Sequence, residues 1–228
     1  GKTAFALNIA QQSAVKAGAS VLIFSLEMSQ EQLGQRLIAM QARVESEKLK
    51  KGTLDLKDWD RINFALNELN NTKIVIDDTP GISIMEMRNK CRRLKAEQGL
   101  DLIVVDYLQL MTFDGRADSR QQEISALSRH LKLLAREMNC PVIVLSQLSR
   151  APELRQDKRP MLSDLRESGS IEQDADIVMF LYRDDYYNEN TEKPGVCEIN
   201  IAKHRSGPTD RIDLTWVARY TKFSDKAL

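Results

Sequence analysis

The first three residues of the chain have the types and the order needed to bind a phosphate group. Gly1-Lys2-Thr3 match the last three positions of the pattern G-x-x-x-x-G-K-[ST], and a segment with helical periodicity, 3–16, follows at once. A helix that begins here directs free N–H groups and the positive end of its dipole towards phosphate oxygens. Lys2 would then reach the β- and γ-phosphates, and the Thr3 hydroxyl would bind Mg²⁺. A three-residue match is short, and a solvated helix start is the alternative.

Polar side chains that suit the remaining chemistry follow short apolar runs. Asp106 comes directly after LIVV, Glu27 lies just beyond VLIFS, and Gln147 lies just beyond VIVL. An aspartate at a buried strand end can hold Mg²⁺, and a glutamate beside it can polarise the water that attacks a γ-phosphate. The Gln147 amide can contact the same phosphate. The alternatives are a capping aspartate, an acidic residue that leads into a helix, and an ordinary polar strand end.

The elements that must position these groups alternate along the chain. Helices are expected over 3–16, 30–43, 56–69, 83–98 and 121–139, and buried strands over 21–25, 74–76, 102–105, 142–145 and 177–181. Strands that alternate with helices predict an α/β fold with a mostly parallel sheet covered on both faces. Right-handed crossovers place the carboxyl ends of parallel strands along one rim, where ligands bind. The last part is expected to form an antiparallel pair, 196–202 and 211–217, joined by the loop 204–210.

Composition narrows the function classes. The 228 residues include 33 Lys+Arg and 33 Asp+Glu, so the formal net charge is zero, which excludes nucleic-acid coating by bulk charge but not a local basic patch. No apolar run approaches the ~20 residues of a membrane-spanning helix. The three cysteines are far apart and form no C-x-x-C pair, which is typical of reduced thiols in an intracellular protein.

Seven blocks of the sequence carry a family resemblance. They are GKTAFALNIA, IFSLEMS, IDDTP, VVDYLQLM, VLSQLSR, LRESGSIEQDADIVMFLYRDDYY and AKHRSGP. In this order they resemble the C-terminal ATPase domain of DnaB-type bacterial replicative DNA helicases over essentially the whole chain. The resemblance implies a RecA-like P-loop NTPase fold, a homo-hexameric ring in the cytoplasm, ATP and Mg²⁺ as cofactors, and ATP-driven 5′→3′ translocation on single-stranded DNA that unwinds the duplex at the replication fork.

The resemblance also assigns roles to residues of the nucleotide site. The first three residues look like the end of the phosphate loop, and Glu27 in SLEMS looks like the catalytic base. Asp106 in VVDYLQ looks like the magnesium aspartate, and Gln147 in LSQLSR looks like the phosphate sensor. Lys203 and Arg205 in AKHRSGP look like basic finger residues that enter the neighbouring subunit's site, where a cation stabilises transition-state charge. From the residues alone, an exposed hairpin tip is the alternative.

Two segments are candidates for DNA contact. Arg166, Glu167 and Gly169 resemble the family's DNA-contacting loop, which faces the central pore. Arg166 can make charge-assisted bonds to phosphate, and Gly169 permits a close backbone approach. Glu167 can orient a neighbouring cation. The basic segment 150–159 is either a second, mobile pore loop or a solvated surface loop.

We interpret residues 1–228 as one ATPase domain that begins inside the phosphate loop of a longer protein. The first half of that loop is then missing, as are the N-terminal domain and linker helix that the family uses for ring assembly and primase contacts; primase and a helicase loader are the implied partners. Two other functions remain open. A RecA-type recombinase shares the fold but forms open filaments, and a nucleotide-binding scaffold would recruit partners without catalysis.

Overall fold

The parallel sheet that carries the predicted rim is present. The computed structural model describes residues 1–226, except for the side chains of 166–168. Its first sheet has the order β2-β1-β3-β4, and all three pairings are parallel. The strands are β1 (Ser20–Ser25), β2 (Lys73–Asp77), β3 (Leu102–Asp106) and β4 (Val142–Val144). Their carboxyl ends therefore share one edge, with Ser25 in register with Asp106.

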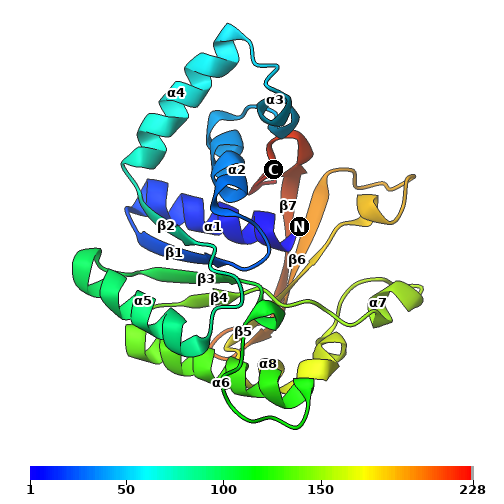
Figure 1. Ribbon diagram of the computed structural model, residues 1–228. Helices are drawn as coiled ribbons and strands as arrows, with labels where there is room; N and C mark the ends of the chain where they lie inside the picture. The colour runs from blue at the N-terminus through cyan, green and yellow to red at the C-terminus, as the bar shows by residue number, and fades with distance from the viewer. Residues whose placement is uncertain (227–228) are drawn as a thin grey trace.

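Helices cover both faces of this sheet (Figure 1). They are α1 (Lys2–Ala17), α2 (Gln30–Ala42), α3 (Ser46–Lys51), α4 (Leu56–Asn70), α5 (Ile84–Gln98), α6 (Arg120–Met138), α7 (Ala151–Leu154) and α8 (Gly169–Asp174). Because successive strand residues point to opposite faces, Val21 and Ile23 pack with α1 and α2, whereas Leu22 and Phe24 pack with α5 and α6. The core that contains Val21 and Ile23 holds α1 against the sheet, with its first residue at the rim.

Two helices, α2 and α5, begin with reciprocal capping bonds. The Ser29 hydroxyl accepts the backbone N–H of Gln32, and the Gln32 side chain accepts the N–H of Ser29. Ser83 and Glu86 form the same reciprocal pair before α5. These bonds satisfy N–H groups that have no partner within the helix. The short helix α3 was not predicted, because its six residues, SEKLKK, show no apolar periodicity.

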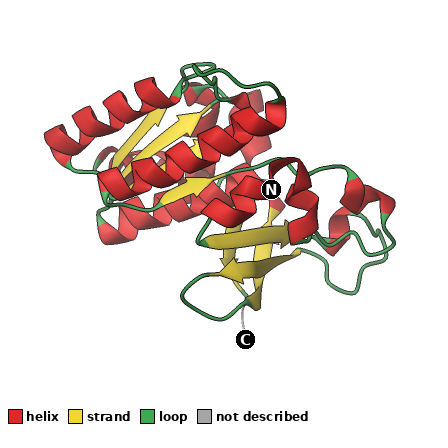
Figure 2. Ribbon diagram, turned by 90° about the horizontal axis from the view of Figure 1, so that it is seen from below, coloured by secondary structure: helices red, strands yellow, loops and turns green. Residues whose placement is uncertain are grey.

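A second, antiparallel sheet contains the rest of the strands, in the order β5-β6-β7-β8. Its strands are β5 (Ile177–Tyr182), β6 (Val196–His204), β7 (Asp210–Val217) and β8 (Lys222–Asp225). The predicted hairpin is confirmed as β6 and β7, but this sheet is larger than the predicted pair, since β5 and β8 join it on either side. Figure 2 shows the two sheets as separate groups of strands. Among the described helices, none has the length and hydrophobicity needed to cross a bilayer.

Candidate functional site

Lys2 lies where α1 meets the sheet rim. Gly1 is the N-cap of α1, and the Lys2 ammonium donates a hydrogen bond to the Ser146 carbonyl oxygen, at 2.8 Å, just beyond β4. The ammonium also lies 5.8 Å from the centre of the Tyr107 ring. Burial lowers the pKa of Lys2, while the negative charges of Asp106 and Glu27 partly oppose that shift. The cation therefore sits in the middle of the predicted phosphate site.

One buried carboxylate oxygen of Asp106 has no hydrogen-bond partner among the described residues. It is the last residue of β3 and is 4% exposed, and its Oδ2 has no hydrogen bond among the described residues. Burial raises the pKa of Asp106, and the charge of Glu27 raises it further; the Thr3 side-chain hydrogen bond, Lys2 and Arg36 act in the opposite direction. A buried, unsatisfied oxygen beside a hydroxyl group is a suitable donor set for a hard cation.

This donor set fits Mg²⁺ in one particular way. The described residues contain no cluster of three or more His, Cys, Asp or Glu side chains that could hold a metal alone. Mg²⁺ usually keeps several waters and binds through one or two protein groups plus substrate phosphates. Thr3 and Asp106 provide those protein groups, and Lys2 and the start of α1 provide a place for the phosphates.

Glu27 is held near this centre by the backbone around it. The N–H of Leu26 donates to the Asp106 carbonyl oxygen at 2.7 Å, which fixes the segment that leads to Glu27. The Glu27 side chain is exposed, and its charge acts on both Asp106 and Lys2. An exposed carboxylate near a buried cation is well placed to contact water. Arg36 of α2 also acts on Asp106, and sequence reasoning missed it because helical spacing gave it no distinctive position.

Gln147 is exposed beyond β4, and a second glutamine positions its backbone. Gln109, in the short 3-10 helix Leu108–Leu110, accepts the N–H of Gln147 at 3.2 Å and donates to the hydroxyl of Ser146 at 2.9 Å. Gln109 thus ties the chain after β3 to the chain after β4. Sequence analysis missed this role, although Gln109 lies within the block VVDYLQLM. The structure places Lys2, Thr3, Glu27, Asp106 and Gln147 along one rim.

Asp77 and Asp78, which also end a strand, serve the fold instead. Asp77 accepts hydrogen bonds from the Lys90 ammonium at 2.5 Å and from the Thr79 N–H at 3.1 Å. Asp78 accepts the N–H of Gln30, at 2.8 Å, at the start of α2. Because their oxygens are engaged in these bonds, the two aspartates stabilise a turn and a helix end.

Lys203 and Arg205 have contacts in a different part of the molecule. Lys203 is in β6 and donates to the carbonyl oxygen of Glu172. Arg205 follows β6 and lies 3.5 Å from an oxygen of Asp176, with both side chains about half exposed. Within the described part of the chain, the side-chain hydrogen bonds and ion pairs of these two cations go to residues 172–176 and none goes to the phosphate-site residues. Lys203 is partly exposed and Arg205 is exposed.

The candidate DNA loop follows a residue, Asp164, that forms an ion pair within the chain. The side chains of Arg166 and Glu167 lie outside the described residues; their backbone belongs to the 3-10 helix Leu162–Ser168. Just before them, Asp164 accepts two hydrogen bonds from the Arg155 guanidinium, at 2.9 and 2.7 Å. Gly169 begins α8, is exposed, and has open space where a Cβ would lie. Whether Gly169 meets a phosphate closely stays a prediction.

The segment 150–159 is not a freely solvated loop. Arg155 is bonded to Asp164, and the Arg159 guanidinium makes two hydrogen bonds, at 2.8 and 2.9 Å, to the Glu198 carboxylate, whose side chain is 6% exposed. The N–H of Ser149, two residues after Gln147, donates to the Asp164 carbonyl oxygen at 3.2 Å. Gln147, Ser149, Asp164 and Leu165 line the same cavity of about 360 Å³. The chain after β4 is therefore bonded to Asp164, two residues before the candidate DNA loop.

The parallel sheet, the helix that begins at Lys2 and the carboxylate at the end of β3 together define a RecA-like α/β domain of the P-loop NTPase class. The family can be given as well. A model of the DnaB-like helicase C terminal domain matches residues 1–225, and the chain belongs to that family.

Curated relatives agree with this assignment. The chain is 57% identical to the replicative DNA helicase DnaC of Bacillus subtilis and 56% identical to the replicative DNA helicase DnaB of Geobacillus stearothermophilus. Each match covers 98% of this chain and 49% of the relative. The chain thus spans about half the length of these relatives.

Solved structures also resemble this chain, at lower sequence identity. One structure, described as that of an ATPase domain, superposes with a TM-score of 0.95 at 43% identity, over 99% of this chain and 81% of that one. A DnaB-like replicative helicase, described with its interactions with primase, gives the same TM-score and identity over 99% of this chain and 55% of that one. These similarities confirm the RecA-like fold that the sequence predicts.

The unpaired oxygen of Asp106 leads to a prediction about stability. Because the pKa of Asp106 is raised on folding, the folded state binds more protons between the unfolded and folded pKa values, and stability falls as pH rises through that range. In the full-length protein without nucleotide or Mg²⁺, Asp106→Asn is expected to raise the free energy of unfolding at pH 7 by about 1–3 kcal/mol. The gain should vanish as the pH falls towards about 4. Urea unfolding across this pH range measures it.

Asp77→Asn is the control, because it should change the free energy of unfolding at pH 7 in the opposite direction to Asp106→Asn. Although burial raises the pKa of Asp77, its bonds to Lys90 and Thr79 lower it overall. This variant should be less stable than the parent protein at pH 7, and its deficit should shrink at acid pH. If Asp106→Asn destabilised the protein at pH 7, Oδ2 would have a partner and the proposed cation position would be wrong.

Proposed function

We propose that this chain is the motor domain of a replicative DNA helicase that hydrolyses ATP with Mg²⁺ and translocates 5′→3′ on single-stranded DNA, unwinding the duplex at the replication fork. The observation that carries the proposal is the meeting of Lys2, Thr3 and the unpaired Oδ2 of Asp106 at one sheet rim. We also propose that Gly1 ends a phosphate loop whose first half precedes this chain.

The residues of the rim divide the hydrolysis step between them. Lys2 and the N–H groups at the start of α1 bind and orient the phosphates. Thr3 and Asp106 would hold Mg²⁺, which when bound neutralises phosphate charge. Glu27 accepts a proton from the attacking water through its carboxylate. Gln147 contacts the terminal phosphate through its amide, and Gln109 keeps its backbone in position.

The last cation at the site comes from a neighbouring subunit in this proposal. Lys203 and Arg205 lie at the end of β6, and in the described part of the chain their side chains have only exposed or partly buried contacts, to residues 172–176. Such contacts contribute little to stability and are readily exchanged. In a homo-hexameric ring, the pair would enter the next subunit's site and stabilise the charge of the transition state.

DNA contact is assigned to Arg166, Glu167 and Gly169. The pair Arg155–Asp164 fixes the chain just before these residues, and Ser149 links it to the segment of Gln147. A change at the phosphate sensor can therefore be transmitted to the DNA loop through a short path. A closed ring retains its strand topologically, so a few pore-facing groups per subunit suffice in a chain without net charge.

The other proposed partners would bind regions of the full-length protein that lie outside this chain. A primase and a helicase loader are proposed partners of the regions outside this chain, and the proposed location is the cytoplasm. The relevant support is the similarity to a DnaB-like helicase whose structure was described together with its interactions with primase.

Unwinding by the full-length protein tests the function. Given ATP and Mg²⁺, it should separate forks that carry a 5′ single-stranded tail and leave forks with only a 3′ tail intact.

Single-stranded DNA should also stimulate ATP turnover by the full-length protein. The variant Arg166→Ala should lose that stimulation and keep its basal turnover. The control is Arg93→Ala, on the exposed face of α5. Helical filaments in place of closed rings by electron microscopy would indicate a recombinase, and the absence of any magnesium-dependent turnover would indicate a scaffold.

A further inference from the structure

Arg205 contacts a carboxylate that lies outside the proposed phosphate site. Nη1 of Arg205 is 3.5 Å from an oxygen of Asp176, and the N–H of Arg205 donates a hydrogen bond to the Asp176 carbonyl oxygen at 2.8 Å. This backbone bond lies next to the pair Ile177–His204, where the ladder between β5 and β6 begins. Asp176 therefore contacts both the backbone and the side chain of Arg205.

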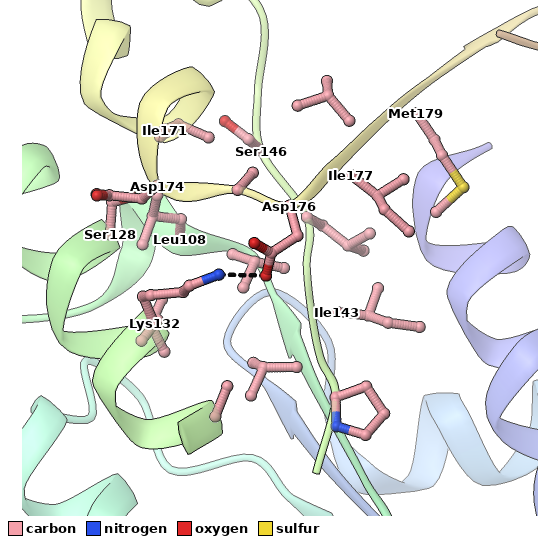
Figure 3. Close-up of a pocket in the computed structure, with 18 of the residues that line it drawn as sticks. Leu108, Ser128, Lys132, Ile143, Ser146, Ile171, Asp174, Asp176, Ile177 and Met179 are labelled. Atoms are coloured by element: carbon pink, nitrogen blue, oxygen red, sulfur yellow. Dashed lines mark hydrogen bonds and ion pairs between the residues drawn. The ribbon is translucent and has the colours of Figure 1, made fainter. Parts of the chain in front are cut away.

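Asp176 is held in place by α6. The Lys132 ammonium of that helix donates a hydrogen bond to the other carboxylate oxygen of Asp176. Figure 3 shows this contact beside a cavity of about 850 Å³ that β4, β5 and α6 line. One helical turn earlier, the Ser128 hydroxyl donates to the Asp174 carboxylate at 2.8 Å, so α6 also anchors the chain just before Asp176.

The carboxylate of Asp176 is negatively charged at neutral pH. Its hydrogen bond to Lys132 lowers the pKa of Asp176, and burial opposes this shift only in part. The positive charges of Lys132, Arg205 and Lys203 lower the pKa of Asp176 further. Three cations therefore lie near one carboxylate, and without its charge they would repel one another.

The carboxyl end of α8 provides the other contacts of the two finger cations. The Lys203 ammonium donates to the carbonyl oxygens of Glu172 and Gln173. Nη2 of Arg205 donates to the Gln173 carbonyl oxygen at 3.4 Å. Carbonyl groups in the last turn of a helix lack partners within the helix, and basic side chains commonly bind them. The end of β6 is therefore attached to α8, the short helix that begins at Gly169.

These contacts leave most of the Arg205 guanidinium free. The group has five N–H donors in a rigid planar fork. In the described part of the chain its contacts are with Asp176 and with one carbonyl oxygen, and both distances are long, at 3.5 and 3.4 Å. The Arg205 side chain is 53% exposed. Asp176 thus orients one edge of the group, and the remaining N–H donors are left for phosphate oxygens.

We propose that Asp176 is a positioning residue for Arg205. Its negative charge keeps the guanidinium beside the end of β6, in the orientation in which Arg205 enters the neighbouring subunit's phosphate site. Asp176 touches no reacting atom, and its effect passes entirely through Arg205. Holding a catalytic group in its working orientation before the reaction lowers the entropic cost of reaching the transition state. The inference rests on the proposed function, because it requires Arg205 to act on the nucleotide.

The variant Asp176→Asn of the full-length protein tests this role. It keeps the backbone carbonyl that accepts the Arg205 N–H and removes the negative charge. With ATP, Mg²⁺ and single-stranded DNA, its turnover number should fall by about 10- to 100-fold, as expected for a misplaced catalytic group, and its nucleotide affinity should change little. Asp176→Glu restores the charge and should recover most of the lost turnover. The side chain of Asp176 is 54% exposed, so both variants should fold.

Asp213→Asn is the matched control. Asp213 is an acid of β7 in the same sheet, and it forms an ion pair with Lys226 at 3.0 Å. Removing this charge should leave turnover unchanged. An equal loss in Asp213→Asn, or a loss in Asp176→Asn that Asp176→Glu does not recover, would overturn the proposal. Unchanged turnover in Asp176→Asn would also overturn it, and so would faster turnover, which would show that Asp176 restrains Arg205 instead.

Mixed rings show whether Asp176 acts across the subunit interface. At equal ratio with Glu27→Gln, Asp176→Asn should regain turnover to about a quarter of the parent value, because about a quarter of the sites combine an intact Glu27 with an intact finger from the neighbour. Mixing Asp176→Asn with Arg205→Ala should restore nothing, because neither variant supplies an intact finger. Recovery in the second mixture, or none in the first, would mean that Asp176 acts on its own subunit's site, and the proposal would fail.

The proposed function can fail separately from this inference. Turnover of Arg205→Ala is measured alongside, and the mixture of Arg205→Ala with Glu27→Gln shows that subunits exchange. If Arg205→Ala kept the turnover of the parent protein, the finger role in the proposed function would be wrong. If Arg205→Ala lost turnover while Asp176→Asn did not, the finger role would stand and only the positioning role would be removed.

Discussion

Replacing Arg205 by alanine in the full-length protein is expected to reduce ATP turnover by about 10³–10⁵-fold, the usual range for a cation that stabilises phosphoryl-transfer charge. Nucleotide affinity should change little, because the guanidinium acts chiefly on charge that develops in the transition state. The protein should still fold, since the only described partners of Arg205 are Asp176 and a carbonyl oxygen, both at the surface. Steady-state turnover and equilibrium nucleotide binding measure the two effects.

Arg211→Ala is the matched control for this variant. Arg211 lies in the same hairpin, is similarly exposed, and contacts Glu198 at 3.9 Å, where Arg159 already provides the main pairing. Its removal should leave turnover unchanged. An equal loss in both variants would show that the hairpin as a whole is sensitive, and the finger role of Arg205 would lose its support.

Mixing experiments separate action within a subunit from action across an interface. Neither Arg205→Ala nor Glu27→Gln should hydrolyse ATP alone. In rings mixed at equal ratio, about a quarter of the sites would combine an intact Glu27 with an intact Arg205 from the neighbour, so activity should reappear. If Arg205 served its own subunit, no site in the mixture would be complete and the mixed sample would stay inactive.

The second large effect is expected at Glu27. Glu27→Gln should lower turnover by about 10²–10⁴-fold, the usual contribution of a general base, with nucleotide affinity retained. The side chain is exposed, so its loss costs little stability, and removing its charge also removes one of the influences that raise the pKa of Asp106. Single-turnover hydrolysis measures the chemical step directly.

Glu31→Gln is the control for the base. Glu31 is an exposed acid in the first turn of α2, a few residues further along the same segment, and should affect only the helix end. Turnover in Glu27→Gln within a few-fold of the parent protein would leave the attacking water without its proposed base and would require another acceptor at the rim.

Much of the fold could be predicted because its signals are local. Helices expected over 30–43, 83–98 and 121–139 are present as α2, α5 and α6, with bounds that agree to within one residue. The continuous apolar runs predicted buried parallel strands, and the handedness of their connections then required Glu27, Asp106 and Gln147 to share an edge.

Other features depend on contacts between distant residues, which no local pattern encodes. β5 pairs with β6, and β8 pairs with β7, in the antiparallel sheet. The apolar content of β5 and β8 would suit either sheet, so it does not predict which sheet they join. Arg155 and Arg159 have the composition of a solvated loop, yet Asp164 and Glu198 hold them. Gln109 acquires its role only because Gln147 is folded against it.

The sequence by itself determined the type of domain and the side chains at its rim, since residue types, caps and strand runs act over a few positions. The tertiary structure alone decided that Asp106 has a buried oxygen without a hydrogen-bond partner among the described residues, that Lys203 and Arg205 lie away from the phosphate site, and that β4 and β5 border the same apolar cavity. Those three facts depend on burial and on the distance between separate elements, and such quantities exist only once the chain has folded.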